Sequence, residues 1–166
     1  MNRALSFFTL LCCSGKERKV TFQEFDRAKP DRKITAIKVH WGHWIDGLEV
    51  QFDRQSGTLH GGSHSKNNQP FEIPDGAYLQ KVVGSVNKLY VTRLQFTLTN
   101  GTISKEYGTT KDAGDRFEFT AREGDVISGI HGSLITQNDD GADRAGNYIG
   151  AFGVYTAPKP NAHVSL

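Results

Sequence analysis

The sequence predicts an all-β fold, and three observations lead to that prediction. Short runs rich in β-branched and aromatic residues alternate between apolar and polar positions. Turn signals separate these runs at the spacing of all-β proteins, and glycine is abundant, with 18 in 166 residues. No segment keeps a helical period for more than a few turns. A chain of this length is sufficient for one domain with a hydrophobic core.

The first half of the chain contains five expected strands. A turn with Pro30 precedes the clean alternation that starts at Lys33, and Gly42 turns the chain into a hairpin partner. The last of the five is short and of edge type, because prolines bracket it. The strands are expected at residues 20–25, 33–40, 44–52, 58–60 and 70–74.

The second half continues the same rhythm. Asn100-Gly101 is a strong type I′ hairpin signal between two alternating runs. Pro158 and Pro160 end the domain. Strands are expected at residues 78–86, 90–99, 102–107, 116–120, 126–134 and 148–155.

Composition and charge exclude several classes of function. The net charge is +2 and the basic residues are scattered, so we expect no nucleic-acid partner. The only cysteines, Cys12 and Cys13, are adjacent, which excludes a disulfide framework and a cysteine-based zinc site. No segment is apolar enough for membrane insertion. Ser133 and His131 could be a nucleophile and its base, but no third catalytic group accompanies them. We therefore expect neither an enzyme nor a cofactor.

Two interpretations of the N-terminus stay open. Residues 1–15 have the layout of a secretory signal, with a positive start, a short apolar run and small residues after it. They also suit an added N-terminal strand. The chain is secreted in the first case and cytoplasmic in the second. The domain division is therefore an N-terminal segment 1–19, a domain 20–157 and a tail 158–166.

The most informative stretch consists of residues 126–134 and 148–155. Glycines within and between these runs exclude a helix and let the backbone approach a neighbouring backbone or a ligand. The polar segment 136–147 between them is predicted to be a long hairpin loop, and loops of this length are often functional.

Several of these runs resemble jacalin-related lectins. The similarity rests on residues 33–39, 44–52, 94–101 with Tyr107-Gly108, 127–134 and 151–155, and it extends over residues 20–155. It implies a β-prism of three four-stranded Greek-key sheets with pseudo-threefold symmetry. It also implies calcium-independent carbohydrate binding at a shallow site on one end of the prism. A glycine-rich N-terminal loop and a C-terminal Gly-x-x-x-Asp loop form that site in the family.

The chain departs from this pattern in the C-terminal loop. Counting from Gly132 places Thr136 at the aspartate position, and counting from Gly146 places Gly150 there. Near the N-terminal loop only Gly15 is present. The carbohydrate-binding residues predicted from the resemblance are Gly132, Thr136, Gly146, Asn147, Tyr148 and Gly150. Backbone N–H groups would hold sugar hydroxyls, and Tyr148 would pack on the sugar ring.

Other candidate sites have simpler explanations. Asp139, Asp140 and Asp143 could supply a carboxylate or bind calcium, but a solvated acidic turn explains them. His40-x-x-His43 and His60-x-x-x-His64 suggest a metal, yet strand positions three apart point to opposite faces, so no metal site is expected. Trp41 and Trp44 are candidates for the core or for stacking on sugar. Asn100-Gly101-Thr102 fits both an N-glycosylation acceptor and a turn.

The predicted function is a lectin module that recognises mono- or oligosaccharides of the mannose or galactose type. Its partner is a carbohydrate or glycoconjugate, and a shallow site implies weak single-site affinity, so a homo-oligomer or array would supply multivalency. The alternative is a module that has lost the sugar site and serves as a protein-interaction or structural domain.

Overall fold

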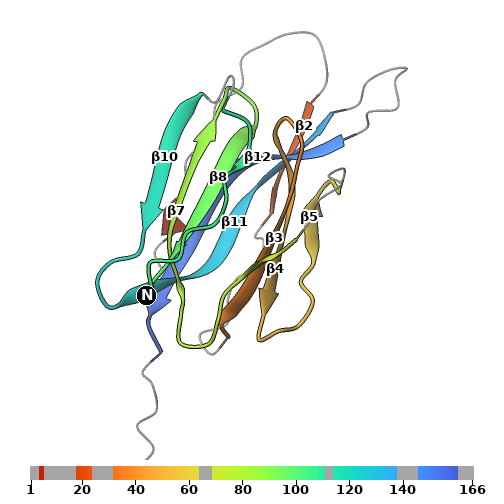
Figure 1. The fold of residues 1–166 in the computed structure, drawn as a ribbon. Helices are drawn as coiled ribbons and strands as arrows, with labels where there is room; N and C mark the ends of the chain where they lie inside the picture. The colour runs from red at the N-terminus through yellow and green to blue at the C-terminus, as the bar shows by residue number, and fades with distance from the viewer. Residues whose placement is uncertain are drawn as a thin grey trace, which may run out of the picture.

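The computed structural model describes residues 4–5, 18–23, 32–63, 69–110, 114–137 and 146–160. All of its regular elements are strands, which confirms the all-β prediction (Figure 1). In chain order the strands are β1 (Ala4–Leu5), β2 (Arg18–Gln23), β3 (Ile34–Trp41), β4 (Ile45–Phe52), β5 (Leu59–Gly61), β6 (Phe71–Glu72), β7 (Leu79–Val86), β8 (Val91–Leu98), β9 (Tyr107–Gly108), β10 (Asp115–Thr120), β11 (Asp125–Gln137) and β12 (Gly146–Pro158).

The strands form three four-stranded antiparallel sheets, and two of these are simple Greek keys. The order β5-β4-β3-β6 joins three consecutive strands and returns the fourth beside the first. The order β10-β7-β8-β9 repeats this arrangement with the next four strands. The predicted Greek-key sheets are therefore present.

The third sheet, β1-β12-β11-β2, has the same order if the chain is read from β11 through β12 and on to β1 and β2. It combines both ends of the described chain, because β1 pairs with β12 and β2 pairs with β11. The predicted boundary between residues 19 and 20 falls inside β2, and the domain division stays a prediction. Three equivalent sheets give the fold its pseudo-threefold symmetry.

The core lies between the three sheets. Alternating positions of each sheet point into it, and burying these aliphatic and aromatic side chains is the main stabilising term of the fold. Its fully buried members come from all three sheets and include Ile37, Ile45, Leu48, Leu79, Leu94, Phe96, Leu98, Ile130 and Ile149.

Two strands are much shorter than the sequence predicts, and β6 covers only Phe71–Glu72 of the edge strand expected at residues 70–74. The predicted run 102–107 forms only an isolated bridge between Ile103 and Thr97, followed by β9. The cause is Ser104, whose Oγ accepts a hydrogen bond from the Phe96 N–H at 3.0 Å, where a backbone carbonyl would act in a regular ladder. A turn is present at Asn100-Gly101, but it is not the predicted type I′ turn, because Gly101 has a positive φ of 85° and Asn100 does not. The Gly101 N–H donates to the Leu98 carbonyl at 3.0 Å, so the central residues of the turn are Thr99 and Asn100.

Candidate functional site

The connected ends of three hairpins, β3–β4, β7–β8 and β11–β12, lie together at the upper end of the prism in Figure 1. In each hairpin the pairing register shifts by one residue near the start of the second strand. The residue left out of register is Asp46 in the first hairpin, Thr92 in the second and Gly150 in the third. Such a β-bulge re-aims the residue that it releases.

The backbone confirms that the bulges of the first two hairpins are equivalent. The Asp46 carbonyl accepts a hydrogen bond from the Gly62 N–H at 2.9 Å. The Thr92 carbonyl accepts one from the Thr109 N–H at 3.0 Å. Asp46, Thr92 and Gly150 therefore occupy one structural position in three copies.

Each bulge is preceded by a fully buried β-branched residue and, one position earlier, by an aromatic residue. The aromatic residues are Trp44, Tyr90 and Tyr148, here called the aromatic trio. The rings of Trp44 and Tyr90 stack at 4.4 Å between centroids with an interplanar angle of 20°. Tyr148 meets Trp44 edge-on at 5.7 Å and Tyr90 at 5.2 Å. The trio joins the three hairpins at the end of the prism.

The first hairpin contains the spacing Gly-x-x-x-Asp, as Gly42-His43-Trp44-Ile45-Asp46. The Gly42 N–H donates to the Trp44 carbonyl at 3.0 Å, which closes the turn. Asp46 is itself buried, at 5% exposure. A Cβ placed on Gly42 would lie 3.7 Å from the Asp46 Oδ2, so the exposed Gly42 lies between this carboxylate oxygen and the surface without a side chain of its own. A carboxylate accepts hydrogen bonds from two neighbouring hydroxyls, which is the chemistry of sugar recognition.

Sequence reasoning missed Asp46 as a candidate residue for this site. The signal was present in the spacing from Gly42 to Asp46, but the pattern was sought only in the C-terminal loop. The structure adds that Asp46 stands at the bulge position that Gly150 fills in the third hairpin.

The structure brings four of the predicted site residues together at the connected end of β11–β12. Thr136 and Asn147 face each other across the ladder, and the Thr136 hydroxyl donates to Asn147 Oδ1 at 2.8 Å. Gly146 pairs with Gln137, and Tyr148 belongs to the aromatic trio.

The other two predicted residues lie further along the strands. Gly132 pairs with both Phe152 and Gln23 in the middle of the sheet and is buried. Gly150 is also buried, and a Cβ there would lie 2.6 Å from Ile135 Cγ1. A role of all six residues in sugar binding stays a prediction.

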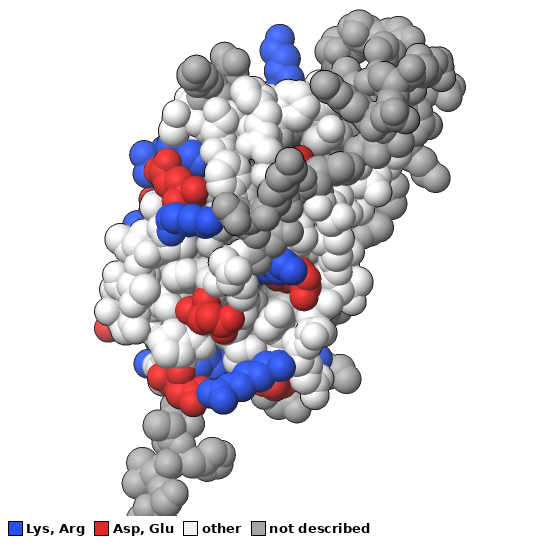
Figure 2. All heavy atoms as spheres, turned by 45° about the vertical axis from the view of Figure 1, so that its right-hand side comes forward, with Lys and Arg blue, Asp and Glu red and all other residues white. Residues whose placement is uncertain are grey.

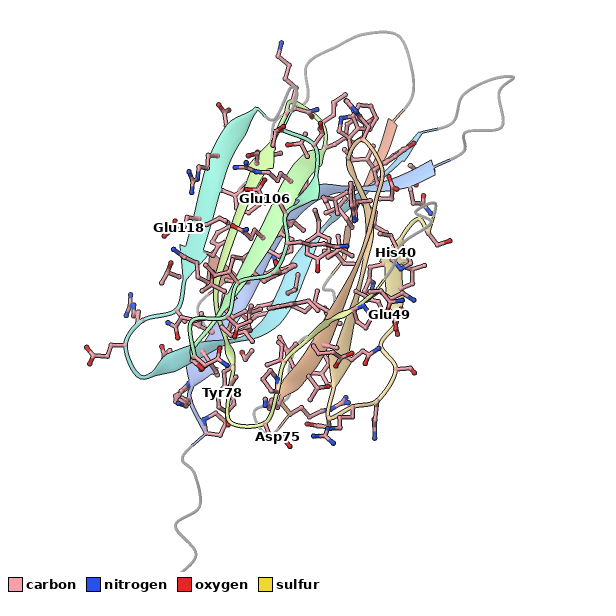
Figure 3. All side chains as sticks on the ribbon, viewed as in Figure 1. His40, Glu49, Asp75, Tyr78, Glu106 and Glu118 are labelled. Carbon is pink, nitrogen blue, oxygen red and sulfur yellow. The ribbon has the colours of Figure 1, made fainter. Side chains whose placement is uncertain are left out.

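The histidines do not form a metal centre with the other side chains described. His40 is 4% exposed on β3, whereas His43 is exposed in the turn. Burial, and then the charge of Lys38, lowers the pKa of His40, and Glu49 on β4 opposes this shift (Figure 3). Over the described ranges, no three histidine, cysteine or acidic residues come close enough to hold a metal ion.

Other candidates of the sequence are placed elsewhere or lie outside the description. Trp41 packs against the core, and Trp44 belongs to the trio. His131 and Ser133 are both buried in β11. Cys12, Cys13, Gly15, His64, Asp139, Asp140 and Asp143 lie outside the described residues.

Charged side chains are mixed in sign over the described surface. On the face in Figure 2, Lys and Arg are interspersed with Asp and Glu. Ion pairs join several of them, including Arg54–Asp75 at 2.8 Å and Arg93–Glu106 at 3.5 Å. Where the chain is described, it has no helix with the length and hydropathy needed to cross a membrane.

Comparison with solved structures shows the fold. A prostate-specific glycoprotein lectin superposes with a TM-score of 0.65 at 16% identity, covering 90% of this chain and 98% of its own. A mannose-binding jacalin-related lectin from Ananas comosus gives 0.62 at 19% identity, with 94% and 99% covered. Malaysian banana lectin gives 0.59 at 20% identity, with 87% and 100% covered. The β-prism expected from the sequence is thereby confirmed.

Comparison of sequences identifies the family. No curated protein sequence matches the chain significantly. The family model of the jacalin-like lectin domain matches residues 14–139, which is most of the chain. The chain therefore belongs to the family of jacalin-like lectin domains.

Proposed function

We propose that this protein binds carbohydrate at the upper end of the prism, with the turn from Gly42 to Asp46 as its principal contact. The observation that carries the proposal is the Asp46 carboxylate, placed by a β-bulge beside the exposed Gly42. Family membership supports a function in binding rather than in catalysis. Residues Thr136, Gly146, Asn147 and Tyr148 remain the proposed contacts from the third hairpin.

The solved structures with the same fold suggest mannose as the first sugar class to test. The jacalin-related lectin from Ananas comosus is described as mannose-binding. Artocarpin, another solved structure with this fold, is described as a lectin with mannose specificity. Both are less than 25% identical to this chain, so mannose-type and galactose-type glycans should be tested together. The site needs no metal in this proposal, because carboxylate and backbone groups make the contacts.

The test is a glycan array with the full chain, with and without chelator, followed by titration of the bound glycan. We expect selective binding that chelator does not change. Asp46→Asn should weaken it about tenfold or more, because hydrogen bonds to a charged acceptor are lost. Asp75→Asn is the matched control, since it makes the same change at the opposite end of the prism (Figure 3).

A second candidate function is protein interaction by a prism without a sugar site. It is favoured by Gly150, which leaves the third hairpin without a carboxylate at its bulge. An array without any selective binding by the folded chain would support this candidate and reject the lectin proposal. If Asp46→Asn remains folded and binds like the native chain, carbohydrate binding survives but the proposed site is wrong.

A further inference from the structure

β10 (Asp115–Thr120) is an edge strand with a free outer side. It ends its sheet in the order β10-β7-β8-β9, and Figure 1 shows its outer side turned away from the rest of the prism. Within the described part of the chain, β7 is the one strand that pairs with it. Its six residues form an uninterrupted ladder with β7, and only Phe119 is buried. An open, regular edge of this length can pair with a further strand.

The register with β7 identifies the backbone groups that this edge leaves free. Just beyond the strand, the Ala121 N–H donates to the Gln80 carbonyl at 2.9 Å. Bonded and non-bonded pairs alternate along an antiparallel ladder, so every second residue of β10 directs its N–H and C=O groups away from β7. These outward-facing residues are Arg116, Glu118 and Thr120.

The side chains of β10 leave the edge open and give it charge. The Phe117 ring occupies the space that a side chain at Gly84 would need, so it lies over β7 and not over the free edge. Arg116 and Glu118 point to the other face of the sheet, where both are exposed. The Glu118 carboxylate lies 3.9 Å from the Lys81 ammonium, a long ion pair that leaves it able to bind a closer cation. The edge thus presents one positive and one negative side chain, two positions apart.

These two charges select the register in which a second copy of the chain fits. Two copies that pair antiparallel through β10 are related by a two-fold axis, which can pass through Arg116, Phe117 or Glu118 in the middle of the strand. An axis at Arg116 or at Glu118 sets that residue opposite its own copy, and like charges directly opposite are destabilising. An axis at Phe117 sets each Arg116 opposite the partner's Glu118, in a pair that exchanges both backbone hydrogen bonds. The charges and the free backbone groups therefore agree on one register.

We propose that β10 is a self-association surface, through which two copies of this chain pair antiparallel about a two-fold axis at Phe117. The sheet then continues from one prism into the other, and the upper ends of the two prisms point in opposite directions. An interface of one strand from each copy is small, so we expect a weak dimer with a dissociation constant between about 10 μM and 1 mM. The inference holds whether or not the chain binds carbohydrate.

The experiment is sedimentation equilibrium of the full chain over this range of concentration. We expect a monomer–dimer equilibrium in the native chain. Arg116→Glu and Glu118→Arg should each weaken association about tenfold or more, because each sets like charges opposite one another across the edge. An equimolar mixture of these two variants should restore association, since every charge then faces an opposite one. Arg54→Glu is the matched control, because it makes the same change in an exposed arginine of another sheet and should leave the dimer intact.

Hydrogen exchange adds a measurement that is specific to the strand edge. The amides of Arg116 and Glu118 should exchange more slowly as the concentration rises, because pairing bonds the N–H groups that face outwards. A chain that stays monomeric at the highest concentration overturns the proposal. A dimer that both charge variants leave unchanged uses another surface and overturns it as well. If the single variants lose association and their mixture does not recover it, the register at Phe117 is wrong.

Discussion

The first and third hairpins use one backbone arrangement and fill it in opposite ways. In both, the second strand bulges just after a buried β-branched residue. The registers make Gly42 the counterpart of Ile135, since each follows the residue paired next to the bulge by one position. In the first hairpin a glycine faces an aspartate, Asp46, and in the third an isoleucine faces a glycine, Gly150.

This exchange of large and small residues explains why the third hairpin lacks the carboxylate of the family pattern. A Cβ on Gly150 would lie 2.6 Å from Ile135 Cγ1, 2.7 Å from its Cδ1 and 3.1 Å from Ser133 Oγ. The space that an aspartate would need is taken by the side chain opposite. The bulge position alone therefore does not admit a carboxylate, because the facing residue must also be small.

The largest effect is expected at Gly150, the bulge position of the third hairpin that the Ile135 side chain crowds. Gly150→Ala should lower the free energy of unfolding by about 1–3 kcal/mol, because the added methyl group overpacks the space beside Ile135. Gly42→Ala is the matched control and should change stability by less than about 0.5 kcal/mol, since its Cβ meets only Asp46 Oδ2 at an ordinary 3.7 Å. Denaturant unfolding of both variants measures the difference.

A double-mutant cycle tests the cause of that destabilisation. In an Ile135→Ala background, the further change Gly150→Ala should cost clearly less than it does in the native chain, because the facing Cγ1 and Cδ1 atoms are gone. Equal costs in the two backgrounds would show that Ile135 is not what closes the position.

A smaller effect, on glycan affinity and not on stability, is expected at Gly42 in the first hairpin. Gly42→Ala should leave the fold intact but weaken glycan binding about tenfold, because a methyl group would stand beside the Asp46 carboxylate and block one hydrogen bond to it. Titration of the glycan selected by the array measures the affinity. Unchanged affinity in this variant would mean that sugar does not approach Asp46 past Gly42.

Local patterns predicted the fold well because its elements are local. Alternation located most of the strands, and Asn100-Gly101 located a turn that the structure contains. The strand expected at residues 102–107 was too long, because the Ser104 hydroxyl replaces a backbone acceptor, an event that alternation does not report.

The candidate site was harder to predict because it depends on register. A β-bulge is a relation between two strands, so the sequence of β4 alone does not show that Asp46 leaves the ladder. The aromatic trio is assembled from residues 44, 90 and 148, which only the threefold arrangement of the sheets brings together. Tyr148 was the one member predicted to contact sugar, while Trp44 was weighed against a place in the core.

The smallest effect is expected in the pH dependence of the unfolding free energy, in which the first hairpin differs from the other two. The residue before the bulge pair is His40 in the first hairpin and Ser85 and Ser133 in the other two, and all three are buried. Burial and Lys38 hold the pKa of His40 below its ordinary value, so the folded state favours the neutral ring. Its contribution to stability is fully present above about pH 6.5, the ordinary histidine pKa, and is lost as the pH falls through that value towards the lower folded pKa.

His40→Ser gives the first hairpin the residue of the other two and should flatten this acid slope of the unfolding free energy. If the slope between about pH 7 and pH 5 is the same in His40→Ser as in the native chain, another group causes it, and the difference between the hairpins does not extend to their protonation.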